Sequence, residues 1–492
     1  MVITGESVAW LSIEEAARQL RAGELTATAL CGAMLERIRS LDPSLHSFLS
    51  VDEHGASAAA QRADARIQTR RMAPLTGIPI SVKDHFATRR LPTTVASAVF
   101  EGYQPGIDAA VVERVNEAGA VVLGKANMYE LGSGWGTFGH FPVALNPWNL
   151  EHSPGGSSSG SAAGVAAGLS LGSIASDGGG SARVPANYCG VVGLKATHGR
   201  ISFFGSIPMP DDTQPGGPAH RLAKSISAVG VITRSVRDAA IMLGTLAGHD
   251  PRDPGSLLEP VDEYVGACVG DARGVVVGVP WETIRDGVTA DVADAFDASL
   301  RVLEAAGAKV RDIPSPPLLA EIGDIWMTIA YVEMATAFRR FHADSREQIG
   351  PEMAQRIETG LATSQAAYDA ADARRNELRT QFLAAMGGCD VVATPTAPGP
   401  PPSMDELRRR ASDLQDIGQL ARFTRPHNLT GFPAITVPNG VAGGLPLGLQ
   451  IAGRSLDERA ILRVADAYER RTEWHELRPP MAQAGTEVHA DG

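Results

Sequence analysis

Short apolar runs alternate with helix-like stretches along this chain, and this alternation restricts the fold more than any other feature. The runs 78–82, 121–123 and 275–279 have the length of buried strands, whereas 108–118 and the segment after Thr289 have helical spacing. Strands that alternate with helices predict an α/β protein. Further strands are expected at 309–313, 391–393, 434–437 and 447–451.

Charge and cysteine usage exclude several classes of protein. The formal net charge is −12 and the longest basic run is Arg408 to Arg410, so a nucleic-acid partner is not expected. The uncharged stretch 153–176 is mostly Gly, Ser and Ala, which is too weakly apolar for a membrane span. The opening MVITGESVAW has no secretory pattern, and the four cysteines have no metal-ligand spacing. We expect a cytoplasmic protein with no membrane association, no metal and no organic cofactor.

Two glycine-rich turns carry serines and lie between stretches that look like buried elements. They are GGSSSGS at 155–161 and DGGGSAR at 177–183. Glycine lets backbone N–H groups converge on one point, as a developing oxyanion requires, and a serine beside such a nest is a candidate nucleophile. A flexible linker is the alternative, but a linker between buried elements would be unusual.

A serine nucleophile needs a base, and the sequence offers two arrangements. Ser158 matches the Gly-x-Ser-x-Gly elbow of α/β-hydrolases, but the elbow must follow a strand and 146–154 cannot form a buried one. Lys83 follows the apolar run 78–82, where desolvation would lower its pKa toward the neutral, basic form. A solvated surface lysine is the alternative.

Ordered motifs over nearly the whole chain resemble those of the amidase signature hydrolases. The motifs are GIPISVKD (77–84), GKANM (124–128), NPW (146–148), GGSSSG (155–160), DGGGSAR (177–183), CGVVGLK (189–195), 230–238, TPT (394–396), NLTG (428–431) and GLPLGLQ (444–450).

The resemblance implies a Ser-cisSer-Lys triad. In that triad Ser181 attacks the carbonyl carbon, Ser157 relays the proton, and neutral Lys83 is the base. The backbone amides of Gly178, Gly179 and Gly180 would hold the oxyanion.

The resemblance also implies the architecture. It is a single large α/β/α sandwich with a twisted mixed sheet covered by helices. We expect an N-terminal helical segment over 1–70 packed on a catalytic domain over 71–480, in which 318–386 is a helical segment at the pocket rim. Residues 481–492 are expected to form a loose tail.

Three positions depart from the usual pattern of the family. His85 stands where Asn is usual, Ser176 where Thr is usual, and Gly178 where a larger residue is usual. None of them removes a triad atom. Asp177 and Arg183 are expected to pair and brace the loop, and His85 is expected either to tune Lys83 or simply to fill space.

The expected reaction is hydrolysis of a carboxylic amide, or of a related carbamate, urea or ester, by a monomer or homodimer that acts on a small molecule. An apolar wall is expected, which favours uncharged aryl or alkyl amides and anilides over glutamine, because an unpaired buried ion costs several kcal/mol. Its members are predicted to be Met128, Tyr129, Trp135, Phe204 and Trp326.

Two alternatives stay within the same fold. The first is the A subunit of a glutamine-dependent amidotransferase, which works with partner subunits; that subgroup carries Asn-Asp-Ile where this chain has Leu420-Ala421-Arg422. The second is a scaffold subunit without activity, and the intact triad argues against it.

Overall fold

The computed structural model of the chain describes residues 8–134, 140–207, 225–410 and 418–483. Within them the strands form one 11-stranded sheet in the order β1-β3-β2-β4-β6-β5-β10-β11-β9-β7-β8. The strands are β1 (Phe48–Val51), β2 (Pro79–Lys83), β3 (Val121–Ala126), β4 (Gly172–Asp177), β5 (Val192–Lys195), β6 (Ala228–Thr233), β7 (Val276–Val279), β8 (Lys309–Asp312), β9 (Val391–Pro395), β10 (Ala434–Ala442) and β11 (Leu445–Ala452).

The sheet is mixed, because parallel pairs flank an antiparallel centre. The pairs β3–β2, β2–β4, β9–β7 and β7–β8 are parallel, and the remaining neighbours are antiparallel. The predicted α/β class and the twisted mixed sheet are therefore confirmed. All six residues of β4 and of β6 are buried, as expected for strands covered on both faces.

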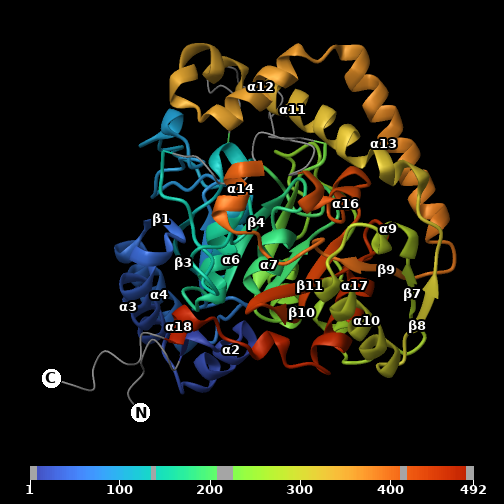
Figure 1. Cartoon of the computed structure of the whole chain (residues 1–492). Helices are drawn as coiled ribbons and strands as arrows, with labels where there is room; N and C mark the ends of the chain where they lie inside the picture. Colours follow the sequence, from blue (N-terminus) through green and yellow to red (C-terminus); the bar gives the residue numbers. More distant parts are fainter. Residues whose placement is uncertain (1–7, 135–139, 208–224, 411–417, 484–492) are drawn as a thin grey trace.

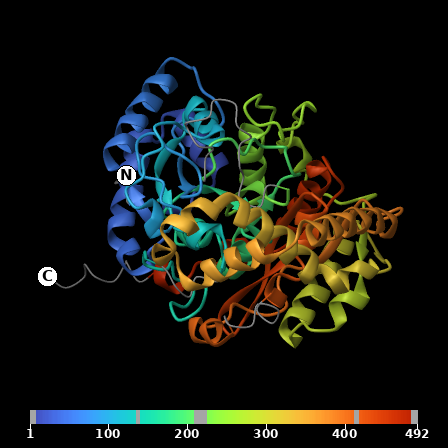
Figure 2. The same cartoon turned by 90° about the horizontal axis from the view of Figure 1, so that it is seen from above.

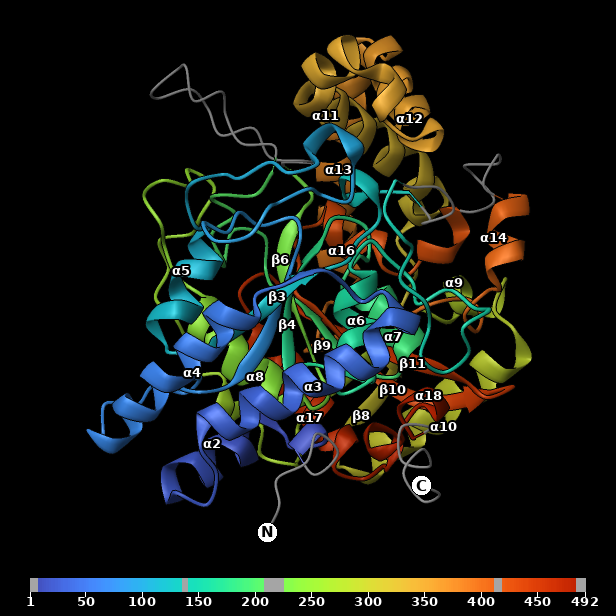
Figure 3. The same ribbon diagram turned by 90° about the vertical axis from the view of Figure 1, so that its left-hand side faces the viewer.

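Helices surround this sheet in Figures 1 and 3. They are α2 (Ile13–Ala22), α3 (Ala27–Leu45), α4 (Glu53–Gln68), α5 (Ala110–Glu117), α6 (Ser159–Ala166), α7 (Arg183–Cys189), α8 (Val236–Leu246), α9 (Trp281–Arg285), α10 (Ala290–Ala305), α11 (Ile322–Asp344), α12 (Pro351–Ala362), α13 (Gln365–Ala385), α14 (Met404–Arg410), α16 (Arg425–Leu429), α17 (Glu458–Glu469) and α18 (Pro480–Gln483).

Two glycines in neighbouring strands show that α7 and α8 cover opposite faces. A Cβ added to Gly230 of β6 would lie 2.9 Å from Ala182, directly before α7, whereas one added to Gly172 of β4 would lie 2.6 Å from Met242 of α8. Gly172 pairs with Thr233, three positions after Gly230. Because side chains alternate along a strand, the two glycines face opposite sides.

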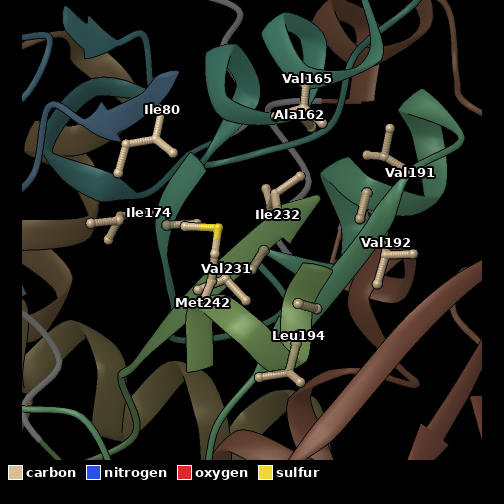
Figure 4. Packing of buried hydrophobic residues seen from close by; sticks show 14 of the residues in the cluster. Ile80, Ala162, Val165, Ile174, Val191, Val192, Leu194, Val231, Ile232 and Met242 are labelled. Carbon is tan, nitrogen blue, oxygen red and sulfur yellow. The ribbon is translucent and has the colours of Figure 1, made fainter. Parts of the chain in front are cut away.

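Aliphatic side chains from neighbouring strands and helices fill the centre of the protein (Figure 4). Ile80, Ile174 and Ile232 come from β2, β4 and β6, and each is fully buried. Val165 of α6 and Met242 of α8 belong to the same cluster and are also fully buried. This packing fixes the strands whose ends carry the candidate site.

The N-terminal region contains a strand as well as the expected helices. Helices α2, α3 and α4 lie within residues 1–70, and β1 pairs antiparallel with β3 at one edge of the sheet. Most of the expected tail, 484–492, lies outside the described residues. The division into 1–70 and 71–480 stays a prediction.

The helices α11, α12 and α13 form a layer at one end of the molecule. They stand at the top of Figure 1 and lie over the sheet in the view from above in Figure 2. Helix α11 packs against both α12 and α13. All three lie in the segment 318–386, which was expected to be helical.

Candidate active site

The parallel pairing of β2 and β4 brings two distant motifs together. Val82 pairs with Ile174, and the strands end at Lys83 and Asp177. The carboxyl ends of parallel strands meet at the same edge of a sheet, where ligands bind in many α/β proteins. Lys83 therefore lies beside the start of the second glycine-rich turn.

Lys83 is completely buried and hydrogen-bonded to two serines. Its Nζ donates to Ser157 Oγ and to Ser176 Oγ, each at 2.8 Å. Burial lowers the pKa of Lys83 to about 7, although the charge of Asp177 works in the opposite direction. The amine is thus partly neutral near pH 7, and it can accept a proton along the bond to Ser157.

Ser157 lies in the first glycine-rich turn, and its peptide bond with Gly156 is cis. Tyr129 supports this turn, because its backbone N–H donates to Ser157 O at 3.0 Å. A Cβ at Gly156 would lie 2.0 Å from the Tyr129 ring, so only glycine fits there. The N–H of Ser158 donates to Ser181 O at 3.1 Å, which holds the two serine turns side by side.

The second turn is built on a buried ion pair. Arg183 donates from Nε and Nη2 to the two oxygens of Asp177, both at 2.9 Å, and both side chains are fully buried. The predicted pairing of these residues is confirmed. Burial alone would raise the pKa of Asp177, but the Arg183 guanidinium holds it well below its usual range.

The same arginine joins the turn to more distant elements. Its Nη1 donates to Gln450 Oε1 of β11 at 2.7 Å, and its Nη2 donates to Asn428 Oδ1 of α16 at 2.7 Å. Asn428 in turn donates to the Asp177 carboxylate at 2.9 Å. Because every partner is hydrogen-bonded, the network keeps the turn in one conformation.

Two outward hydrogen bonds orient the glycine backbone. Trp326 Nε1 donates to Gly178 O at 2.7 Å, and Thr424 Oγ1 donates to Gly179 O at 2.7 Å. In a planar trans peptide the C=O and the following N–H point in opposite directions. The N–H groups of Gly179 and Gly180 therefore point away from Trp326 and Thr424, respectively.

Only part of the predicted oxyanion nest is open to a ligand. The Gly180 N–H donates to Asp177 Oδ1 at 2.8 Å, so it is already engaged. The Gly179 N–H is the donor that Trp326 orients. At Gly178 an added Cβ would lie 2.6 Å from Ser227 Oγ, which accounts for glycine where the family usually has a larger residue.

Ser157, Ser181 and the three glycines line one pocket. Its other walls include Val184, Trp326, Ala330 and Met334, together with His85, Arg356 and Arg425. The expectation of an apolar wall is therefore wrong, because Arg356 and Arg425, which are distant from Trp326 in the sequence, line the same pocket.

The remaining residues predicted to bind substrate are scattered. Trp326 lines the pocket, whereas Tyr129 lies behind the serine turn, with its hydroxyl 3.1 Å from Ser153 Oγ. Met128 is in the main hydrophobic cluster, and Phe204 lies under the Arg252 guanidinium. Trp135 lies outside the described residues.

His85 lies in the wall of the pocket and contacts the base indirectly. Its Nδ1 is 3.0 Å from Ser176 Oγ, the hydroxyl that also accepts from Lys83. Burial, with the nearby Lys83, lowers the pKa of His85 to about 3, so the ring is neutral near pH 7. It adds no positive charge that would oppose protonation of Lys83.

Comparison with known proteins identifies the family. Residues 29–462 match the family model for amidases, so the chain belongs to the amidase family, the amidase signature enzymes. It is 38% identical over 497 residues to the A subunit of the glutamyl-tRNA(Gln) amidotransferase of Roseiflexus sp. (strain RS-1), covering 96% of this chain and 98% of the relative.

Solved structures show the same fold. The A subunit of the glutamyl-tRNA(Gln) amidotransferase of Thermotoga maritima superposes with a TM-score of 0.77 at 31% identity, covering 95% of this chain and 94% of that one. The peptide amidase of Stenotrophomonas maltophilia gives a TM-score of 0.78 at 29% identity, covering 96% and 98%.

These relatives correct the expected partners. A monomer or homodimer acting only on a small molecule, without nucleic acid, was expected, and that expectation is wrong, because relatives at 38% identity are each one subunit of an enzyme named for a tRNA. The expectation relied on the net charge, which describes the surface of this chain alone and not that of an assembly. In the described part of the chain no helix is long and apolar enough to cross a membrane.

Breaking the Asp177–Arg183 pair should destabilise the protein strongly. Arg183→Met leaves a buried carboxylate without its partner, which costs about 3–5 kcal/mol, and amide hydrolysis should fall with it. Urea unfolding followed by circular dichroism measures the change. Arg18→Met is the control, because the Arg18 side chain is 53% exposed in its pair with Glu15. Loss of this exposed pair should leave the urea unfolding midpoint nearly unchanged. Equal midpoints for both variants would contradict the role of the buried pair.

The activity should depend on the protonation of Lys83. As the pH rises through about 7, Lys83 loses its proton and kcat/KM for an amide should increase to a plateau. Lys83→Ala should lower kcat/KM by about 10²–10⁴-fold or more and remove this rise. A pH profile of both proteins between pH 5 and 9 is the measurement. A natural protein with a flat profile would be incompatible with Lys83 as the base.

Proposed function

We propose that the chain cleaves the C–N bond of a carboxylic amide through an acyl-enzyme on Ser181, and that it does so as the A-type component of a glutamine-dependent amidotransferase. The observation that carries the chemistry is the 2.8 Å hydrogen bond between the buried Lys83 Nζ and Ser157 Oγ, because Ser157 lines the same pocket as Ser181. Because the pKa of the Lys83 amine is lowered, the amine can take the proton of the Ser157 hydroxyl, and Ser157 can then accept the proton of the nucleophile.

In the proposed reaction, Ser181 Oγ attacks the amide carbon while its proton passes to Ser157 Oγ and the Ser157 proton passes to Lys83 Nζ. The carbonyl π-bond opens, and the Gly179 N–H stabilises the resulting oxyanion. When the C–N bond breaks, the relay reverses and Ser157 delivers a proton to the leaving nitrogen. Water then attacks the acyl-enzyme through the same relay, releasing the acid and restoring Ser181.

Two observations favour the amidotransferase setting over neutral aryl amides. Relatives that are named as the A subunit of that enzyme align with at least 94% of this chain at 38% identity. The pocket also contains Arg425, whose guanidinium suits a substrate that carries a carboxylate, such as glutamine, better than an anilide. In this setting the ammonia released at Ser181 is passed to a partner protein.

Two further predictions belong to this proposal. The protein works in the cytoplasm, where its four free, buried cysteines stay reduced. The helical segment 318–386 forms the pocket rim, for which the support is that α11 contributes Trp326 and Met334 to the lining and α12 contributes Arg356.

Acylation should occur on Ser181 and not on Ser158. Ser181→Ala should abolish ammonia release from glutamine. Ser158→Ala should retain most of this activity, because the Ser158 hydroxyl of the natural protein donates to the backbone oxygen of Ser176 at 3.2 Å. Mass spectrometry after treatment with a fluorophosphonate locates the adduct. A label on Ser158 would restore the nucleophile elbow as the explanation.

An experiment that replaces one subunit distinguishes an amidotransferase component from a stand-alone hydrolase. The natural chain, or its Ser181→Ala variant, takes the place of the A subunit in the Roseiflexus amidotransferase, and amidation of glutamyl-tRNA(Gln) is measured for each assembly. Amidation by the assembly with the natural chain, but not by the assembly with the variant, supports the A-type role. Hydrolysis of a nitroanilide in preference to glutamine, with no amidation, would contradict it.

A further inference from the structure

Arg425 is the one arginine of the pocket wall that has no anionic partner among the described residues. Its side chain lies over the Trp326 ring, 4.3 Å from the centroid, and the residue is only 6% exposed. Its buried Nε has no hydrogen-bond partner. Arg356, whose Nε likewise has no hydrogen-bond partner, does have an anionic partner: its Nη2 donates to Glu352 Oε1 at 2.8 Å and its Nη1 donates to Ser133 Oγ at 2.7 Å.

An unpaired buried cation is costly, so its retention needs a reason. Burial, with the nearby Arg356, lowers the pKa of Arg425 to about 10, although Tyr331 works in the opposite direction, and the group stays charged at neutral pH. The cation–π contact with Trp326 compensates only part of the lost hydration. A ligand anion would supply the missing partner.

The position of Arg425 relates it directly to the reaction centre. Trp326 donates through Nε1 to Gly178 O, and an added Cβ at Gly179 would lie 2.8 Å from its ring, so the indole packs against the oxyanion glycines. Arg425 lies on the face of the same indole. Arg425 and Gly179 therefore contact the same indole and line the same pocket, so a carboxylate on a bound amide shares that pocket with the guanidinium.

We propose that Arg425 binds a carboxylate on the acyl half of the substrate and so selects amides of dicarboxylic and acidic amino acids over neutral amides of the same length. The planar guanidinium offers paired N–H donors that match the two oxygens of a carboxylate. This inference rests on the proposed amide hydrolysis and specifies its substrate class. Glutamine and the half-amide glutaramate both carry such a group, and pentanamide is the neutral counterpart.

The test compares kcat/KM for glutaramate and pentanamide in the natural protein and in Arg425→Gln. The natural protein should prefer glutaramate. Arg425→Gln should lower kcat/KM for glutaramate by about 30-fold or more, chiefly through KM, because a partner of a buried charge pair is removed. It should change the value for pentanamide by less than about threefold, since no charge pair is lost.

Arg379→Gln is the matched control, because the Arg379 guanidinium also lies over an aromatic ring, that of Phe432, but outside the catalytic pocket. Arg379→Gln should leave kcat/KM unchanged for both substrates. Arg425→Lys keeps the positive charge but loses the paired N–H donors of the guanidinium, so its kcat/KM for glutaramate should lie between those of the natural protein and Arg425→Gln. Circular dichroism establishes that each variant is folded.

The two proposals fail in different ways. If the natural protein prefers pentanamide, or if Arg425→Gln lowers kcat/KM equally for both substrates, the carboxylate-binding role of Arg425 is wrong while the proposed amide hydrolysis stands. If the natural protein hydrolyses no amide, glutamine included, the proposed function itself is wrong. Should Arg425→Gln fail to fold, the substrate preference of the natural protein and the Arg425→Lys result still decide.

Discussion

Asp177 and Arg183 form a buried ion pair that joins the end of β4 to the start of α7 and, through Asn428 and Gln450, to α16 and β11. The pair costs desolvation but has every hydrogen bond satisfied, so it defines one conformation of the turn between its two residues. That turn contains Ser181 and the oxyanion glycines. The parallel pairing of β2 with β4 then places Lys83 beside it. A fixed loop and a buried amine are thus the two halves of the site.

Much of the fold follows from patterns in the sequence, but strands β4 and β1 do not. The apolar run 78–82 and the segment 434–437 coincide with β2 and β10, because aliphatic residues favour buried strands. Strand β4 has the sequence GSIASD and is buried throughout, so it shows neither alternation nor β-branched enrichment. Strand β1 lies between α3 and α4, in a region for which only helices were expected.

The site could be predicted in part for a related reason. Lys83, Ser157 and Ser181 lie in compact motifs, so their local sequence carries the information. Arg425 has no motif of its own, and its place in the pocket depends on α16 folding against α11, which brings it onto Trp326. The missing counter-charge is visible only once the structure gives the neighbours of the guanidinium. Nor does the sequence of one chain indicate the surface of a partner.

The central claim is that one acyl-enzyme on Ser181 precedes release of the acid, and partitioning with hydroxylamine tests it most directly. An acyl-enzyme has already lost its leaving group, so its division between water and hydroxylamine cannot depend on the group that left. Glutamine and the γ-methyl ester of glutamic acid should give the same ratio of hydroxamate to glutamate at each hydroxylamine concentration. Different ratios from the two substrates, or no hydroxamate from either, would contradict the account.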